Sequence, residues 1–126
     1  MTTPTTATTS VTATDEARLF MINELELSKI VQYDCKTGLE GMVRKSLERM
    51  GCASEDDQPT TLAGKPGRDV RFACDKRPAR GRMRVYCDVH AVATGHVTAY
   101  SVMALYQNEL WNPAEAAAFL DSFVLH

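Results

Sequence analysis

The sequence contains no long apolar run and no marked excess of charge of either sign. It has 126 residues, of which 44% are hydrophobic and 24% are charged. No stretch approaches the roughly 18 consecutive apolar residues that a membrane-spanning helix requires. The formal net charge of −2 provides no general attraction for nucleic acids or anionic membranes. The composition therefore predicts a globular protein with no transmembrane segment and no specific binding of nucleic acid.

Residue types with catalytic or metal-binding chemistry are also scarce. The chain has four cysteines and three histidines, with no C-x-x-C pair and no Gly-x-Ser-x-Gly motif. The segment Gly64–Asp69, GKPGRD, lacks the spacing of a phosphate-binding loop and is not followed by a helix. We therefore predict no catalytic residues, no metal site and no cofactor, and the sequence favours a protein that is not an enzyme.

At this length the chain is expected to form one domain. Residues 1–14, MTTPTTATTSVTAT, include eight threonines and too little large apolar surface to offset the entropy of ordering. They are predicted to be a flexible Thr-rich tail, followed by a single α+β domain over residues 15–126. The tail lacks the basic and apolar regions of a secretory signal. The chain as written is therefore expected in the cytoplasm, or exported if a signal or anchor precedes it.

Two helices are predicted from apolar periodicity and capping residues. Residues 37–50 place their apolar side chains on one face, begin with a capping box and end at Gly51. A second helix is expected to begin at Asn112–Pro113, where asparagine caps and proline occupies the first helical position. Its apolar stripe includes Phe119 and Leu120 and should dock on a sheet.

An antiparallel sheet is predicted over Thr60–Tyr106. Apolar and polar residues alternate in this segment, and Gly and Pro mark turns such as Gly64–Gly67. Val97–Tyr106 is apolar on both faces and is predicted to be a central strand. The polar run Ala53–Thr60 is predicted to be a solvated loop, and Arg18–Leu27 a further strand.

The cysteines allow a restricted set of disulfide pairings. Cys35 and Cys52 flank the first predicted helix and would lie roughly 20 Å apart, beyond the roughly 7 Å that a disulfide allows. Pairing Cys74 with Cys87 would turn Arg82–Tyr86, which alternates like a strand, into a loop. Only links between the helix-flanking pair and the sheet pair remain, and these would favour export. Free, buried thiols are the preferred interpretation.

Several short motifs in the sheet and the last helix resemble a known group of proteins. They are the turn Leu62–Asp69, the strand Arg82–Tyr86, an apolar strand with Tyr100, and the terminal Ala117–Phe123. Together they resemble small uncharacterised bacterial proteins with a PsbP-like fold. The resemblance implies an antiparallel sheet sandwiched between helices, an α/β/α sandwich. It also implies an accessory, assembly or binding role.

Basic residues concentrate around the first predicted hairpin of the sheet. Arg71, Arg82 and Arg84 alternate with apolar positions and are expected to share one sheet face. An open face of this kind would attract an acidic partner. A face covered by a helix would instead pair its arginines with carboxylates such as Asp69 and Asp88. A face that is either solvated or internally paired is favoured over a binding surface. The candidate partner-binding residues are Lys65, Arg68, Arg71, Lys76, Arg77, Arg80, Arg82 and Arg84.

The leading functional hypothesis is a non-catalytic binding or accessory module. It would act through protein–protein contact, with an acidic protein as the partner of the basic hairpin. One alternative is a small ligand- or metal-binding domain or enzyme, with a cleft between sheet and helix near His90 and His96. Another alternative is an immunity or inhibitor protein that blocks one specific enzyme.

Overall fold

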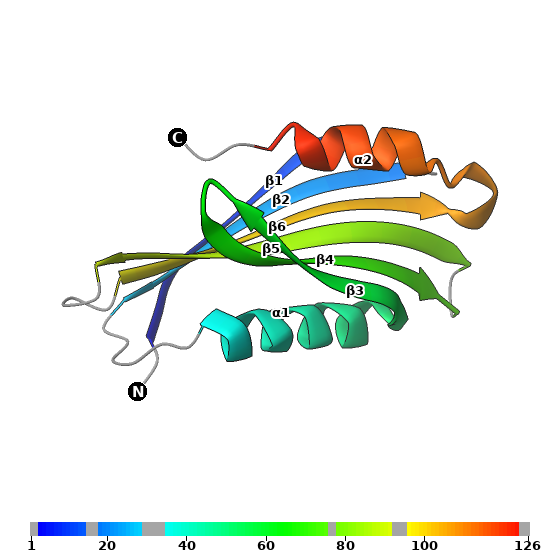
Figure 1. Ribbon diagram of the computed structural model, residues 1–126. Coiled ribbons are helices and arrows are strands. Elements are labelled where there is room, and N and C mark those ends of the chain that lie inside the picture. The colour runs from blue at the N-terminus through cyan, green and yellow to red at the C-terminus, as the bar shows by residue number, and fades with distance from the viewer. Residues whose placement is uncertain (1–2, 15–17, 29–34, 76–77, 92–95, 124–126) are drawn as a thin grey trace.

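The chain folds into one antiparallel sheet with a helix on each of its two faces (Figure 1). The computed structural model describes the backbone of residues 3–14, 18–28, 35–75, 78–91 and 96–123, and the side chains of residues 18–24, 35–75, 78–88 and 98–123. The elements are β1 (Thr3–Thr14), β2 (Arg18–Ser28), α1 (Cys35–Met50), β3 (Cys52–Leu62), β4 (Lys65–Cys74), β5 (Ala79–Ala91), β6 (His96–Gln107), the 3₁₀ turn η1 (Asn108–Leu110) and α2 (Pro113–Asp121).

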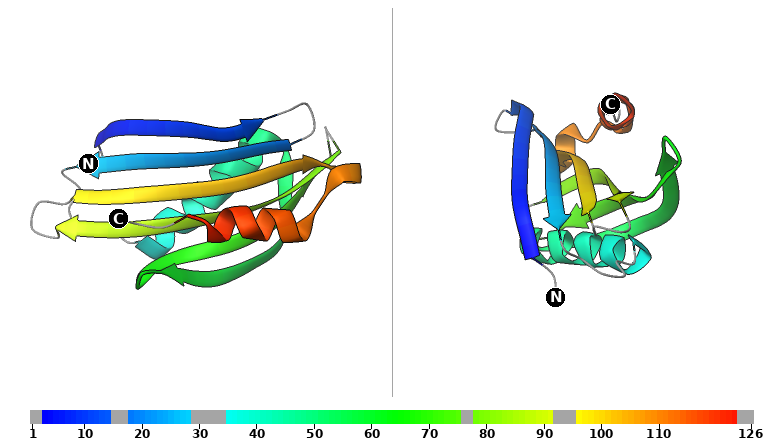
Figure 2. Two further views of the ribbon diagram at one scale, coloured as in Figure 1. Left: turned by 90° about the horizontal axis from the view of Figure 1, so that it is seen from above. Right: turned by 90° about the vertical axis from the view of Figure 1, so that its left-hand side faces the viewer.

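The strand order in the sheet is β1-β2-β6-β5-β4-β3, and all neighbouring strands pair antiparallel. Helix α1 packs on β3, β4 and β5, whereas α2 packs on β5 and β6 from the other side (Figure 2). These contacts confirm the predicted α+β fold with an antiparallel sheet. Strand β6 lies between β2 and β5, so the prediction of a central strand at Val97–Tyr106 is also confirmed.

Residues 3–14 form strand β1, where the sequence predicts a flexible tail. The strand pairs with β2 from Thr3 opposite Ser28 to Thr14 opposite Leu19. The composition argument considered only buried apolar surface, but an edge strand gains its backbone hydrogen bonds from a neighbour. Threonine is β-branched and favours the extended backbone that this pairing needs. The predicted strand Arg18–Leu27 supplies that neighbour as β2.

The polar run Ala53–Thr60 is strand rather than loop, because it lies within the edge strand β3. Most of its side chains are exposed, as an edge strand permits. The β3–β4 turn is also shorter than predicted, and consists of Ala63 and Gly64, with φ of 50° and 79°. Positive φ at both positions is the conformation of a two-residue hairpin loop of type I′. The remaining residues of the predicted turn, Lys65–Gly67, therefore begin β4.

Separate apolar clusters form on the two faces of the sheet. On one face, Leu39, Val43 and Leu47 of α1 pack over the strands. On the other face, Ala116 and Leu120 of α2 are buried, and the rings of Phe20 and Phe119 lie 4.9 Å apart. The buried residues of the α1 face are completed by Val70, Phe72, Cys74, Met83, Val85, Cys87 and Met103.

All four cysteines are joined in disulfides, Cys35–Cys87 and Cys52–Cys74. The interpretation as free thiols is therefore wrong, whereas the two pairings that geometry excluded are indeed absent. Cys35–Cys87 links the first residue of α1 to β5. Cys52–Cys74 joins the neighbouring strands β3 and β4, because Cys52 is the first residue of β3 and lies two residues beyond the last residue of α1. The thiols had no local sequence signal for pairing, since their partners lie 52 and 22 residues away.

Replacing Leu120 by alanine tests the docking of α2. Leu120 is 1% exposed, so the substitution should lower the free energy of unfolding by about 2–5 kcal/mol, as for other core truncations. Urea denaturation followed by circular dichroism measures the change. Leu110→Ala is the matched control, because Leu110 is 48% exposed and its loss should change stability by only about 0.5 kcal/mol. Equal effects of the two substitutions would contradict the docking of α2.

Removing either disulfide should destabilise the protein, and the longer loop should matter more. In the chain-entropy description, a loop of 22 residues stabilises by about 3 kcal/mol and one of 52 residues by about 4 kcal/mol. We expect Cys35→Ser/Cys87→Ser to have the lower free energy of unfolding in urea, compared with Cys52→Ser/Cys74→Ser. Peptide mapping of the non-reduced wild-type protein checks the pairing, and any other connectivity would refute it.

Candidate functional site

Three of the predicted basic residues share the face of the sheet on which α2 packs. Arg82 and Arg84 of β5 alternate with Met83, which packs on the α1 face, so the arginines point to the α2 face. Arg71 lies opposite Arg82 in the β4–β5 register and shares that face. The expectation that these three arginines lie together is confirmed. Lys76 and Arg77 lie outside the described residues.

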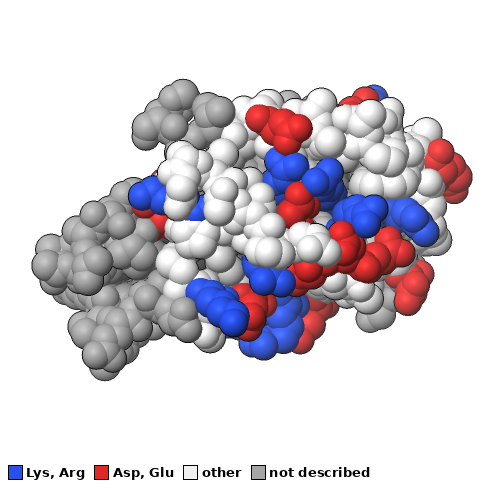
Figure 3. Space-filling view, viewed as in Figure 1, with Lys and Arg blue, Asp and Glu red and all other residues white. Residues whose placement is uncertain are grey.

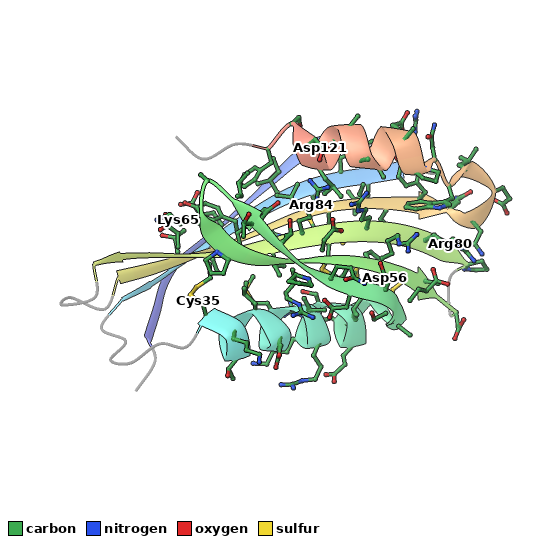
Figure 4. All side chains as sticks on the ribbon, in the orientation of Figure 1. Cys35, Asp56, Lys65, Arg80, Arg84 and Asp121 are labelled. Carbon is green, nitrogen blue, oxygen red and sulfur yellow. A yellow bond between two sulfur atoms is a disulfide. The ribbon has the colours of Figure 1, made fainter. Side chains whose placement is uncertain are left out.

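A four-membered ion network occupies the middle of the α2 face. Asp69 accepts hydrogen bonds from Arg82, Nε to Oδ1 at 2.8 Å and Nη2 to Oδ2 at 2.6 Å, and from Arg84 Nε to Oδ2 at 3.0 Å. Arg84 Nη1 also donates to Oδ1 of Asp121 at 2.6 Å. Figure 4 shows Arg84 on the sheet directed toward Asp121 on α2. The network therefore ties α2 to strands β4 and β5.

The other described residues of the predicted basic set, Lys65, Arg68, Arg71 and Arg80, each have a carboxylate close by. Strand β3 supplies three of these carboxylates: Asp57 lies 2.8 Å from Arg68, Asp56 lies 3.2 Å from Arg71, and Glu55 lies 3.9 Å from Arg80. Lys65 lies 3.0 Å from Asp88. The sequence predicts that these acidic residues lie in a solvated loop, away from the basic hairpin. They lie instead in strand β3, whose pairing with β4 brings them beside the arginines.

The basic concentration is therefore electrically balanced within the described residues. Lys65, Arg68, Arg71, Arg80, Arg82 and Arg84 face six carboxylates, those of Glu55, Asp56, Asp57, Asp69, Asp88 and Asp121. Blue and red atoms alternate over this surface in Figure 3. The sequence favours a face that is either solvated or internally paired, and internal pairing is observed, with Asp69 and Asp88 both among the partners.

Ionisation equilibria in the network favour the paired charges. Burial acts to raise the pKa of Asp69, but hydrogen bonds from Arg82 and Arg84 outweigh it and hold that pKa below its ordinary value. The hydrogen bond to Asp69 raises the pKa of Arg82. Burial, with the acceptor Glu115 at 2.9 Å from its hydroxyl, raises the pKa of Tyr106. This phenol therefore stays protonated and serves as a structural donor.

A shallow pocket lies where β4, β5 and the start of α2 meet. Its volume is about 130 Å³, and it is lined by Arg71, Arg80 and Arg82 together with Glu55, Phe72, Gly81, Trp111 and Pro113. The side chains of Arg71 and Arg80 are 58% and 46% exposed. Leu110, next to Trp111, is 48% exposed. We call Arg71, Arg80, Leu110, Trp111 and Pro113 the Arg–Trp patch.

Sequence reasoning found the two arginines of the Arg–Trp patch but not its apolar members. Trp111 has a visible sequence signal, since it directly precedes the helix cap and can pack against the helix. In the structure its ring lies 5.5 Å from that of Tyr106, edge to face. The exposure of Leu110 depends on the η1 turn and had no sequence signal.

The predicted site at His90 and His96 lies outside the described side chains. Strand β5 contains His90, and β6 begins at His96. In the described part of the chain, no three His, Cys, Asp or Glu side chains are grouped so as to hold a metal ion. No helix among those residues is both long and apolar enough to cross a membrane.

Comparison with known family models gives no match, and comparison with curated proteins gives none. Among solved structures, the chain matches the crystal structure of LpqN, described as involved in cell envelope biogenesis of Mycobacterium tuberculosis. The fold is similar to that of LpqN. The TM-score is 0.60 at 12% identity, over 98% of this chain and 88% of LpqN. This likeness shows the fold alone, and the resemblance to PsbP-like proteins stays a prediction.

Replacing Asp69 by asparagine tests the ion network. The substitution leaves the partly buried Arg82 and Arg84 without their shared anion, so the free energy of unfolding at pH 7 should fall by about 1–3 kcal/mol. Urea titrations at several pH values measure it. Asp57→Asn is the control, because its more exposed pair with Arg68 should contribute less than about 1 kcal/mol.

The pH dependence of the Asp69 contribution follows from the sign of its shift. A carboxyl whose pKa is lowered on folding stabilises the protein above its ordinary pKa of 3.8, and that stabilisation is lost as the pH falls through the lowered value. The difference between wild type and Asp69→Asn should therefore be constant near neutral pH and shrink below about pH 4. A difference that does not depend on pH would contradict the assignment.

Proposed function

We propose that this protein is a non-catalytic accessory module of the cell envelope that binds a protein partner through the Arg–Trp patch. The leading support is the composition of the patch. Arginine and tryptophan are enriched among the residues that dominate protein–protein binding energy. Here Arg71, Arg80 and Trp111 line one pocket of about 130 Å³, and the half-exposed Leu110 directly precedes Trp111 in the chain.

The arginines differ in how readily they could engage a partner. Arg82 and Arg84 are held by Asp69 at 2.6–3.0 Å and are only 25% and 16% exposed. Arg80 lies 3.9 Å from Glu55, and both side chains are about half exposed. Exposed ion pairs of this kind contribute about 0–1 kcal/mol, so exchange for a partner's carboxylate costs little. The proposed partner therefore presents an acidic side chain to Arg80 and an apolar side chain to Leu110.

The two disulfides support an oxidising compartment for the mature protein. Structural disulfides form and persist outside the reducing cytoplasm. The fold is similar to that of LpqN, whose structure is described as that of a protein involved in cell envelope biogenesis. We extend that setting to this chain as part of the proposal, and we assign no enzymatic step to it.

Affinity capture with surface variants tests the proposed function. The envelope fraction of the native host is passed over immobilised wild-type protein, Arg80→Glu/Leu110→Asp, and the control Arg44→Glu, which alters an exposed residue of α1 on the opposite face. A protein retained by wild type and control should bind the patch variant at least about 30-fold more weakly, as loss of a dominant contact implies.

Equal melting temperatures of the three proteins would show that the patch variant is folded. Retention of the same proteins by all three would refute the role of the patch. If the captured protein is an enzyme and its activity falls on binding, the protein acts as an inhibitor through the same patch. Trp111 is left intact in this experiment, because its ring packs on Tyr106 and its loss would disturb the fold.

A further inference from the structure

A row of methionines crosses the sheet on the face opposite the Arg–Trp patch. Met103 of β6 lies directly opposite Met21 of β2 on one side and Met83 of β5 on the other. Residues opposite one another on neighbouring strands point to the same face, with Cβ atoms about 4.5–5.5 Å apart. Three thioether side chains therefore stand side by side on three adjacent strands.

Helix α1 adds a fourth methionine to this row. Met50, the last residue of α1, lines one pocket together with Met21, Met83 and Met103. The pocket lies beside α1, which packs on β3, β4 and β5, and extends over β6 and β2. Its volume is about 190 Å³, and its other lining residues are Asn23, Ser46, Arg49 and Ser101.

The four methionine side chains do not fill the pocket that they line. Met83 is fully buried and Met103 is 6% exposed, yet the pocket between them and Met50 stays open. Met83 and Met103 belong to the buried α1 core together with leucine, valine and phenylalanine side chains, and they lie at the side of that core where the pocket opens. The chain has six methionines, so four of them are concentrated at one cavity. Because four thioether side chains meet at one open pocket, we infer that their sulfur atoms have a role as ligands besides apolar packing.

We propose that this pocket binds a soft monovalent metal ion, Cu(I), through the thioether sulfurs of Met21, Met50, Met83 and Met103. Thioethers are soft ligands that favour Cu(I) over the hard divalent cations. They are uncharged and need no deprotonation, so binding does not depend on pH near neutrality. The cysteine thiols do not compete, because all four are in disulfides.

The disulfides also preorganise the proposed metal site. Cys52 follows Met50 by two residues and is bonded to Cys74 of β4, so the end of α1 that carries Met50 is fixed against the sheet. The other three ligands come from paired strands. Metal binding then requires little rearrangement of the backbone, which favours affinity.

Methyl NMR on the full-length oxidised protein tests the site directly. Protein labelled with ¹³C at the methionine methyl groups is titrated with Ag(I), a redox-inert analogue of Cu(I). The methyl signals of Met21, Met50, Met83 and Met103 should shift together, saturating at one equivalent. The signal of Met42, which packs on the core but does not line the pocket, should not move. Shifts spread over all methionines, or none, would overturn the proposal.

Affinity measurements with variants identify the ligands. Cu(I), kept reduced with ascorbate and without thiols, is titrated in competition with bathocuproine disulfonate. Met21→Leu and Met103→Leu should each weaken binding at least about tenfold, since loss of even an outer-sphere partner of a metal costs about 10–100-fold. Met42→Leu, the matched control, should bind as wild type does. Equal affinity of all four proteins would refute the site.

Arg49 provides a test that separates a cation from an apolar occupant. Arg49 is one of the residues that line the same pocket, and its positive charge repels a cation held nearby. Arg49→Ala should therefore tighten Cu(I) and Ag(I) binding, whereas an unchanged or weaker affinity would count against a bound cation. The Arg–Trp patch lies on the other face of the sheet, so failure of the metal site leaves the proposed partner-binding function to its own experiment.

Discussion

The fixation of helix α1 at both ends is the constraint on which the rest of the structure depends. Cys35, the first residue of the helix, is bonded to Cys87 of β5, and Cys52, the first residue of β3 two residues beyond the helix, is bonded to Cys74 of β4. A small sheet with one helix on each face buries limited apolar surface, so covalent links contribute much of the stability. They also prevent the helix from sliding over the sheet. The space beside α1 over β6 and β2 is therefore a permanent feature of the fold.

Helix α2, on the opposite face, has no disulfide to the sheet. Apolar packing around Leu120 and an ion network hold it in place. Asp69 accepts from two arginines of β5, and one of these also reaches Asp121 on α2. Breaking such a network would leave partly buried charges without partners, which is costly. The same pairing removes the attraction that a bare row of arginines would exert on a polyanion. Among the described arginines of the basic hairpin, Arg71 and Arg80, at the edge of the network, have the most exposed side chains.

Local signals in the sequence were sufficient to locate both helices and the central strands, although α1 begins at Cys35, two residues before the predicted cap at residue 37. The capping residues of α2 and the alternation of β5 act within a few residues, and both were predicted. Strands β1 and β3 were missed because an edge strand needs little apolar surface and is stabilised by its neighbour. Missing β3 also misplaced Glu55, Asp56 and Asp57, and so concealed that the basic hairpin is balanced. The disulfide pairs depend on packing across 22 and 52 residues, which no local pattern encodes.

Strand β5 contributes to both proposed surfaces, because Arg80 and Met83 point to opposite faces of it. Coupling between the two sites would require an element with two alternative arrangements that both ligands distinguish. A strand paired on both sides has no such freedom, and α1 is held at both ends. Metal bound among the methionines should therefore leave the affinity of the Arg–Trp patch unchanged. The fold is thus best understood as a rigid support that presents two independent, preformed surfaces on its two faces.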